Sequence, residues 1–296
     1  MGEGQAGPAR PVTPNLLRGW PLPGADGDKE AKGRLLVVGG STRTPGAVIL
    51  AAESALRVGA GKVQVATVAA TAVHVAATVP EAMVVGLDTA DGEIAPGAAG
   101  HLLELAAGAD AVLAGPGIGD PAAACALLEG LVPSCTTPLV VDALGTAYLT
   151  RHPHGLRHLS GRAVVTPNLT ELAALLEEDE DRCGDDVLGA ARRAASGCGV
   201  TVVSGAAVSY VVEPSGEAWV VDVGAPGTAV AGSGDVKAGA VAGLVARGAR
   251  PTHAAAWGSY LHARVGERLS LTVGRVGFPA RELSVQLPAM MTEVQG

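Results

Sequence analysis

The sequence predicts an α/β protein with a doubly wound, mostly parallel sheet and helices on both faces of that sheet. The first observation is the repeated alternation of short, wholly apolar segments with longer alanine-rich segments. Short apolar runs are typical of strands buried on both faces, as in a parallel sheet covered by helices. The second observation is that glycine or an acidic residue follows most of these runs, at the sheet edge where ligands bind in such folds.

The predicted elements begin with a βαβ unit. Residues 34–40 form an apolar strand that ends in paired glycines, residues 45–58 show a helical pattern, and residues 62–67 predict a second strand. The later predicted elements are a strand and glycine turn over 111–119, strands over 138–143 and 163–168, a helix over 170–178, a strand and hairpin over 200–205, 208–213 and 218–223, and helices over 236–247 and 252–269.

The chain is predicted to contain one domain and an arm. Residues 1–33 are rich in glycine, proline and charge and show little periodicity, so they predict a mostly irregular arm. Neither an internal repeat nor a break in the pattern indicates a second domain. Residues 34–296 therefore predict a single domain.

Composition narrows the classes of function. Hydrophobic residues make up 48% of the 296 residues and aromatic residues only 2%, so the core must consist mainly of alanine, valine and leucine. The net charge is −8 and no lysine or arginine cluster stands out, which argues against a nucleic-acid partner. We find no signal-peptide pattern and no membrane-spanning run, and the four cysteines lack metal-binding spacing. We therefore expect a cytoplasmic protein without a membrane partner.

The segment Ala231-Gly-Ser-Gly-Asp is the strongest candidate for a chemical site. A glycine-rich turn, an acidic residue and a helix start coincide there. The first N–H groups of a helix have no partner within the helix, and together with the helix dipole they favour an anion. Asp235 would then face a hydroxyl next to a transferring phosphate. A turn that merely caps the helix is the simpler alternative.

Two further groups of polar residues have open interpretations. Asp142 follows an apolar strand, where a buried acid is costly unless it is paired or bound to metal, although it could also cap the next turn. His152, His154 and His158 are spaced as metal ligands could be, but no carboxylate or cysteine is near them in the sequence. A solvated linker is the favoured interpretation of the histidines. His262 is expected to act on a ligand only indirectly.

In their order along the chain, the motifs resemble the ribokinase-like superfamily, and within it the ADP- or ATP-dependent NAD(P)H-hydrate dehydratases. The resemblance covers the chain from about residue 34 to residue 269. The segments that carry it are Val38-Gly-Gly-Ser, Pro45-Gly-Ala, Pro80-Glu-Ala-Met, Ala114-Gly-Pro-Gly-Ile-Gly, Val141-Asp-Ala, Thr166-Pro-Asn-Leu-Thr-Glu and Ala231-Gly-Ser-Gly-Asp. Each segment is weak alone, and their common order argues against chance.

The resemblance implies that ADP or ATP with Mg²⁺ phosphorylates the hydroxyl of hydrated NAD(P)H, and that loss of phosphate restores NAD(P)H. Asp235 would be the catalytic base. The other implied positions are an anion hole at Gly232, Ser233 and Gly234; substrate binding at Ala47, Gly117, Gly119, Asn168 and Asp235; nucleotide binding at Ser204, Gly205, Ala206, Ala207, Val208 and Gly234; and metal binding at Glu171 and Asp142. The resemblance also implies a homo-oligomer, and any partner epimerase is expected to be a separate chain.

The chain departs from the family pattern at four places near this site. Thr44 stands where tyrosine is usual, Asn168 replaces a histidine, and Ser204 replaces a lysine. After Asp142-Ala143, the usual second acid and amide give way to residues 144–147, Leu-Gly-Thr-Ala. Losing a lysine beside phosphate would weaken binding by about 1–3 kcal/mol unless another cation replaces it.

Lys237 and Arg43 are the two candidates for that replacement. Lys237 stands where leucine is usual, and the simpler interpretation is that it is a solvated helix residue. The departures also keep two other functions open. One is a small-molecule kinase or specialised-metabolism dehydratase with a changed substrate, and the other is an inactive, nucleotide-binding regulatory protein.

Overall fold

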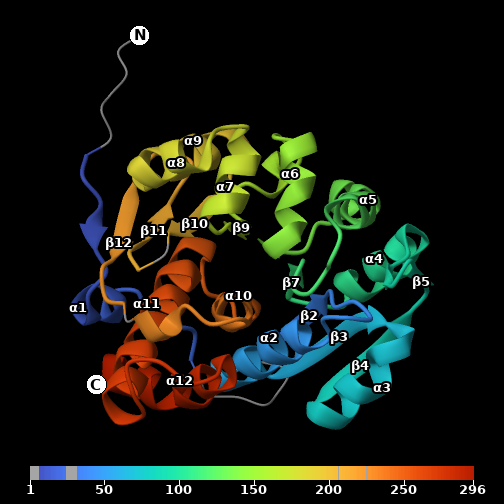
Figure 1. The fold of residues 1–296 in the computed structure, drawn as a ribbon, viewed down its shortest axis with the longest axis horizontal. Helices are drawn as coiled ribbons and strands as arrows, with labels where there is room; N and C mark the ends of the chain where they lie inside the picture. Colours follow the sequence, from blue (N-terminus) through green and yellow to red (C-terminus); the bar gives the residue numbers. More distant parts are fainter. Residues whose placement is uncertain (1–6, 25–31, 206, 225) are drawn as a thin grey trace.

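A ten-stranded sheet forms the centre of the protein in the computed structural model, which describes residues 7–24, 32–205, 207–224 and 226–296 (Figure 1). The strand order is β1-β12-β11-β10-β9-β8-β7-β2-β3-β4. The strands are β1 (Arg10–Pro11), β2 (Arg34–Val38), β3 (Lys62–Val68), β4 (Ala82–Leu87), β7 (Ala111–Ala114), β8 (Leu139–Asp142), β9 (Ala163–Thr166), β10 (Thr201–Gly205), β11 (Ser209–Val212) and β12 (Ala218–Val221). Neighbours pair in parallel except at β10–β11 and β11–β12, which are antiparallel. The predicted doubly wound fold and its hairpin are confirmed.

Helices cover both faces of the sheet (Figure 1). The α-helices are α1 (Pro14–Arg18), α2 (Gly46–Arg57), α3 (Ala69–Thr78), α4 (Ala99–Ala107), α5 (Pro121–Leu131), α6 (Ala147–Arg151), α7 (Leu169–Leu176), α8 (Glu180–Asp185), α9 (Val187–Cys198), α10 (Ser233–Ala246), α11 (Pro251–Thr272) and α12 (Ala280–Gln295). One core lies between the sheet and α2, α10, α11 and α12, and the other between the sheet and α4, α5, α6, α7 and α9. Short 3₁₀ segments and a small hairpin of β5 (Thr89–Ala90) and β6 (Glu93–Ile94) complete the fold.

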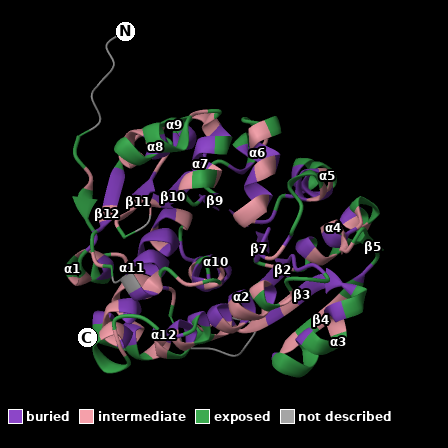
Figure 2. Cartoon of the chain, viewed as in Figure 1, coloured by how far each residue is buried: buried purple, intermediate pink, exposed green. Residues whose placement is uncertain are grey.

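The close packing of α10 against α2 explains the small-residue run that follows Asp235. A Cβ atom added at Gly239 would lie 2.2 Å from the carbonyl oxygen of Ala51, and one at Gly243 would lie 2.8 Å from the Cα of Ala55. Figure 2 shows α10 as a buried helix at the centre of the molecule. Glycine at these positions therefore lets the backbones of α10 and α2 approach closely.

Residues 10–18 differ from the irregular arm that the sequence predicted. The strand β1 pairs in parallel with β12, and Leu17 of α1 is fully buried. The indole N–H of Trp257 donates a hydrogen bond of 2.9 Å to the carbonyl of Trp20. These elements are only two and five residues long, too short to show periodicity. Residues 1–6 and 25–31 of the predicted arm lie outside the described residues.

Within the described ranges, no helix combines the length and the apolar character needed to cross a membrane.

Candidate active site

Three carboxylates from different elements influence one another's charge at the carboxyl ends of the parallel strands. Asp142 ends β8, Glu171 lies in the first turn of α7 after β9, and Asp235 lies in the first turn of α10. Burial is the largest cause of a raised pKa for each of them. The mutual repulsion of their charges adds to the effect at Glu171 and Asp235.

Asp235 is suited to accept a proton near neutral pH. Burial, followed by repulsion from Asp142 and Glu171, raises its pKa from 3.8 to about 7. A general base works best when its pKa lies near the working pH, because it is then both available and basic enough. The carboxyl group is half-buried on α10.

Asp142 is held in place by a hydroxyl and by the backbone that follows it. The side chain is buried, and Thr166 Oγ1 donates to its Oδ1 at 2.6 Å. Burial raises its pKa to about 6, although the hydrogen bond from Thr166 and the positive charge of Lys237 act in the opposite direction. The next residue, Ala143, has a φ of 51°, a conformation that alanine seldom adopts.

Asn168 and Glu171 form a capping box at the start of α7. Asn168 Oδ1 accepts from the N–H of Glu171 at 2.9 Å, and Glu171 Oε2 accepts from the N–H of Asn168 at 2.9 Å. This reciprocal pair orients the Glu171 carboxyl group, whose pKa burial raises to about 7. The exposed Asn168 thus has a local role at the position where the family usually has histidine.

Lys237 is not the solvated residue that the simpler interpretation predicted. It is half-buried one residue beyond Val236 on α10. Burial lowers its pKa, whereas the negative charges of Asp142 and Glu171 raise it. Its own charge lowers the pKa of both carboxyl groups. Lys237 therefore places a positive charge near the carboxylates of Asp142 and Glu171. Sequence periodicity could not show this, because it does not reveal what covers that side of α10.

The start of α10 provides three backbone donors. Gly232 has a φ of 88° and lies against Leu50, so that a Cβ atom there would come within 2.4 Å of Leu50 Cδ1. Among the described residues, the N–H groups of Gly232, Gly234 and Asp235 have no acceptor, as expected for an anion-binding helix start. Space around Gly234 is open.

Ser233 differs from the other residues of the predicted anion hole. Its N–H already donates to the carbonyl of Val230 at 3.1 Å, and its Oγ lies 2.7 Å from Nε2 of His262. Burial and the charge of Lys237 lower the pKa of His262 to about 3, so the imidazole is neutral at physiological pH. His262 therefore reaches the site only through Ser233, in line with the indirect role expected of it.

The two loops expected to bind substrate are joined by side-chain hydrogen bonds. Thr44 Oγ1 donates to the carbonyl of Gly117 at 2.6 Å and lies 2.7 Å from Ser41 Oγ. Gly117 has a φ of 71°, and a Cβ atom there would lie 2.8 Å from Ala47 Cβ. Ala47 and Gly117 are thus in contact, and Thr44 ties the loops together where the family usually has tyrosine.

The backbone N–H of Gly119, the third residue of these loops expected to bind substrate, already donates to the carboxylate of Glu93. The N–H of Gly119 lies 3.2 and 3.1 Å from the two carboxylate oxygens of Glu93. A cavity of about 560 Å³ adjoins this contact, lined also by Thr42, Arg43 and Asp120. Arg43 is exposed on this side of the site, whereas Lys237 lies with the carboxylates.

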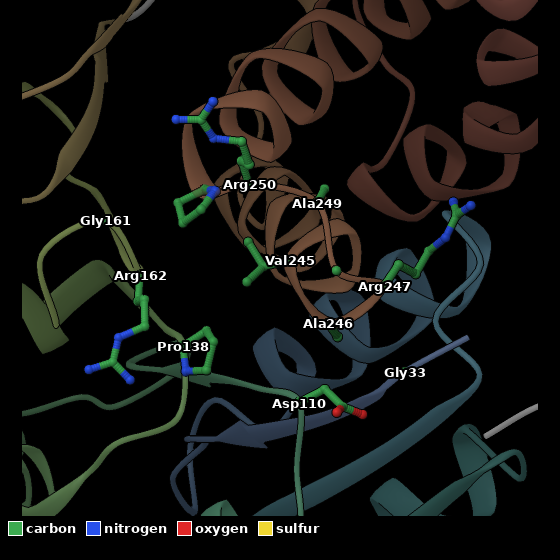
Figure 3. Close-up of a pocket in the computed structure, with 12 residues that line it drawn as sticks. Gly33, Asp110, Pro138, Gly161, Arg162, Val245, Ala246, Arg247, Ala249 and Arg250 are labelled. Atoms are coloured by element: carbon green, nitrogen blue, oxygen red, sulfur yellow. The ribbon is translucent and has the colours of Figure 1, made fainter. Parts of the chain in front are cut away.

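A second cavity lies at the opposite end of the strands (Figure 3). Its volume is about 470 Å³, and it is formed by the α10–α11 turn with Gly33, Asp110, Pro138 and Arg162. These four residues immediately precede β2, β7, β8 and β9, so the cavity is at the amino ends of the strands. This cavity is therefore separate from the carboxylates of Asp142, Glu171 and Asp235.

The comparison with protein families decides the relationship of this chain to known proteins. Residues 35–289 match the Carb_kinase family, described as NAD(P)H-hydrate dehydratase. The chain belongs to that family. The resemblance inferred from the motifs is thus confirmed.

Individual members of the NAD(P)H-hydrate dehydratase family match most of the chain. The ADP-dependent (S)-NAD(P)H-hydrate dehydratase of Xanthomonas campestris is 42% identical over 95% of this chain and 96% of its own length. The bifunctional NAD(P)H-hydrate repair enzyme Nnr of Moorella thermoacetica is 34% identical over 92% of this chain. The chain spans 51% of the length of that bifunctional relative.

Solved structures support the ribokinase-like fold of this family member. A ribokinase-like superfamily protein from Enterococcus faecalis has a TM-score of 0.83 and 26% identity, with 97% of each chain covered. The ADP/ATP-dependent NAD(P)H-hydrate dehydratase of Bacillus subtilis, co-crystallised with ATP and Mg²⁺, has a TM-score of 0.78 over 97% of this chain and 99% of that one. Its 21% identity supports the fold alone.

The segment expected to bind nucleotide in this family member is a tight turn between β10 and β11. Gly205 has a φ of 135°, and a Cβ atom there would lie 2.0 Å from the carbonyl oxygen of Val208. Ser204 is fully buried, and its hydroxyl has no hydrogen-bond partner among the described residues. Ala207 is exposed, and Ala206 lies outside the described residues.

Proposed function

We propose that this chain is a nucleotide-dependent dehydratase that converts hydrated NADH or NADPH back to NADH or NADPH. The observation that carries the proposal is the position of Asp235. Its carboxyl group has a pKa of about 7 and lies in the same helical turn as three backbone N–H groups that lack acceptors. A base beside an anion-binding helix start is what phosphoryl transfer to a hydroxyl requires.

In the first step, Asp235 accepts the proton of the substrate hydroxyl. The hydroxyl oxygen then forms a bond to the terminal phosphorus of ADP or ATP, and the bond from that phosphorus to the rest of the nucleotide breaks. The N–H groups of Gly232, Gly234 and Asp235 donate hydrogen bonds to the phosphoryl oxygens.

In the second step, phosphate leaves the ring carbon with the bonding electrons. A proton is lost from the neighbouring carbon, and the ring double bond forms. Phosphate is a far better leaving group than hydroxide, so phosphorylation makes the dehydration feasible. Ala47 and Gly117, which are in contact, would place the ring, and Asn168 and Gly119 are the other residues that we assign to substrate binding.

The donor set suits Mg²⁺. Asp142 and Glu171 offer carboxylate oxygens, the ligands this ion prefers, and a bound cation would offset the burial that raises the pKa of both groups. When bound, Mg²⁺ would neutralise phosphate charge. We assign the nucleotide to the turn formed by Ser204, Gly205, Ala206, Ala207 and Val208, together with Gly234.

Recovery of NADH absorbance from hydrated NADH tests the proposal. We expect recovery that requires Mg²⁺ and either ADP or ATP, with one phosphate released per NADH formed. Nucleotide binding without recovery would favour the related kinase with another acceptor, or the inactive regulatory protein. An epimerase partner, a homo-oligomer and a cytoplasmic location remain part of the proposal.

A further inference from the structure

Three residues with metal-binding side chains meet between α5 and α6, away from the proposed active site. Cys125 and Glu129 lie one turn apart on α5, and His152 directly follows α6. Their ligand atoms all lie within 4.8 Å of one another. His152 Nε2 is 2.8 Å from Glu129 Oε1, and Cys125 Sγ is 3.5 Å from the same oxygen.

The fold thus supplies the partners that His152 lacks in the sequence. The other two histidines of the loop are engaged elsewhere, since His154 Nδ1 lies 3.0 Å from the carbonyl of Gly197 and His158 Nε2 lies 3.2 Å from that of Cys135. The ring of His152 packs against buried Tyr148, with 4.9 Å between ring centres. This contact orients its Nε2 towards α5.

We propose that Cys125, Glu129 and His152 form a Zn²⁺ site that joins α5 to α6. A thiolate, an imidazole and a carboxylate are the ligand types that zinc prefers, and three protein ligands leave a fourth position for water. Glu129 and His152 are partly exposed, so the ion can enter from solvent on their side. Cys125 is buried and closes the inner side of the site.

Binding must displace one proton and the contacts that these side chains make with one another and with Arg151. The Cys125 thiol releases its proton to solvent as the S–Zn bond forms, and no electron is transferred. His152 binds through the Nε2 lone pair and gives up its contact with Glu129. The guanidinium of Arg151 lies 3.9 Å from both Glu129 and Cys125 and competes for the same negative charge. Its side chain is 65% exposed and is free to turn outward.

The test measures Zn²⁺ and Co²⁺ binding to the full chain with excess Mg²⁺, added to occupy the site that we propose at Asp142 and Glu171. We expect one ion per chain, release of a proton, a higher unfolding temperature, and a thiolate-to-cobalt charge-transfer band. Cys125→Ser and His152→Ala should each lower Zn²⁺ affinity at least tenfold and remove the band. Arg151→Ala should raise the affinity several-fold.

Two matched variants separate this site from other metal contacts. Cys198→Ser removes another buried thiol, and His154→Ala removes a histidine from the same loop, so both should bind Zn²⁺ as the unaltered chain does. Glu129→Gln tests the site without changing a buried residue. No binding, or stoichiometric binding that survives Cys125→Ser, His152→Ala and Glu129→Gln, would overturn the proposal.

Discussion

The hydroxyl oxygen of Ser233 lies 2.7 Å from Nε2 of His262, although 29 residues separate them in the chain. The contact joins the start of α10 to the middle of α11. Because the pKa of His262 is lowered to about 3, its ring is neutral, and the tautomer of the ring sets whether Nε2 or Ser233 Oγ donates in this contact. The Ser233 side chain is thereby engaged by His262, whereas the N–H groups of Gly232, Gly234 and Asp235 have no acceptor among the described residues.

Removing His262 should impair the reaction without changing its pH dependence. His262→Ala leaves the Ser233 hydroxyl free to turn, and we expect kcat/KM to fall about tenfold, equivalent to about 1.4 kcal/mol. His262→Gln retains a hydrogen-bond partner for the hydroxyl, since its amide can donate or accept, and should restore most of the loss. A pH–rate profile of His262→Ala whose midpoint moved away from about 7 would contradict this positioning role.

Lys237 should support nucleotide binding more than Arg43 does. Lys237→Gln removes a positive charge from α10, the helix whose start forms the proposed phosphate site, so we expect the affinity for ADP with Mg²⁺ to fall about tenfold. Arg43→Gln should change this affinity less than about twofold, because Arg43 is exposed on the loop expected to bind substrate. Calorimetric titration compares the two variants. An equal loss of ADP affinity in the two variants would contradict a larger contribution from Lys237.

Glu93 should compete with substrate for the N–H of Gly119. In Glu93→Ala that donor is free, and we expect the KM for hydrated NADH to fall about threefold with little change in kcat. The variant should also be less stable by about 1 kcal/mol, because the hydrogen bonds from the 115–119 loop to the β5–β6 hairpin are lost. Asp91→Asn is a control that removes charge from the lining of the same cavity. An unchanged or higher KM in Glu93→Ala would show that Gly119 does not bind substrate.

The raised pKa of Asp235 should make the folded protein less stable as the pH rises. In the unfolded chain Asp235 has an ordinary pKa near 3.8, whereas in the folded protein its pKa is about 7. The folded state therefore binds more protons between about pH 4 and 7, and the free energy of unfolding falls as the pH rises through this range. Asp235→Asn should raise the free energy of unfolding at pH 8 by about 1–3 kcal/mol and change it little at pH 4. Urea unfolding at both pH values measures the difference, and equal effects at both would contradict the assigned pKa.

The sequence predicted the fold and the strand-end residues because these follow from local patterns. Continuous apolar runs identify strands covered on both faces, and the glycines at Gly117 and Gly232 mark turns that only glycine fits. The family resemblance added the order of the motifs.

Features that depend on distant parts of the chain could not be predicted in this way. The environment of Lys237 is set by Asp142 and Glu171, which follow other strands. Glu93 reaches Gly119 from a hairpin that is too short to show a strand pattern. Leu17 is buried only because β1 and α1 are held against β12 and α12.

The most direct test of the account is the pH dependence of kcat/KM for NADH recovery, measured for the unaltered chain and for Asp235→Asn. We predict that the rate of the unaltered chain rises with pH to a plateau with a midpoint near 7, since Asp235 must be deprotonated to act as the base. Asp235→Asn should lose at least a hundredfold in kcat while still binding ADP. A variant that retains most of the activity, or the same rising profile in Asp235→Asn, would contradict the assignment of Asp235 as the base.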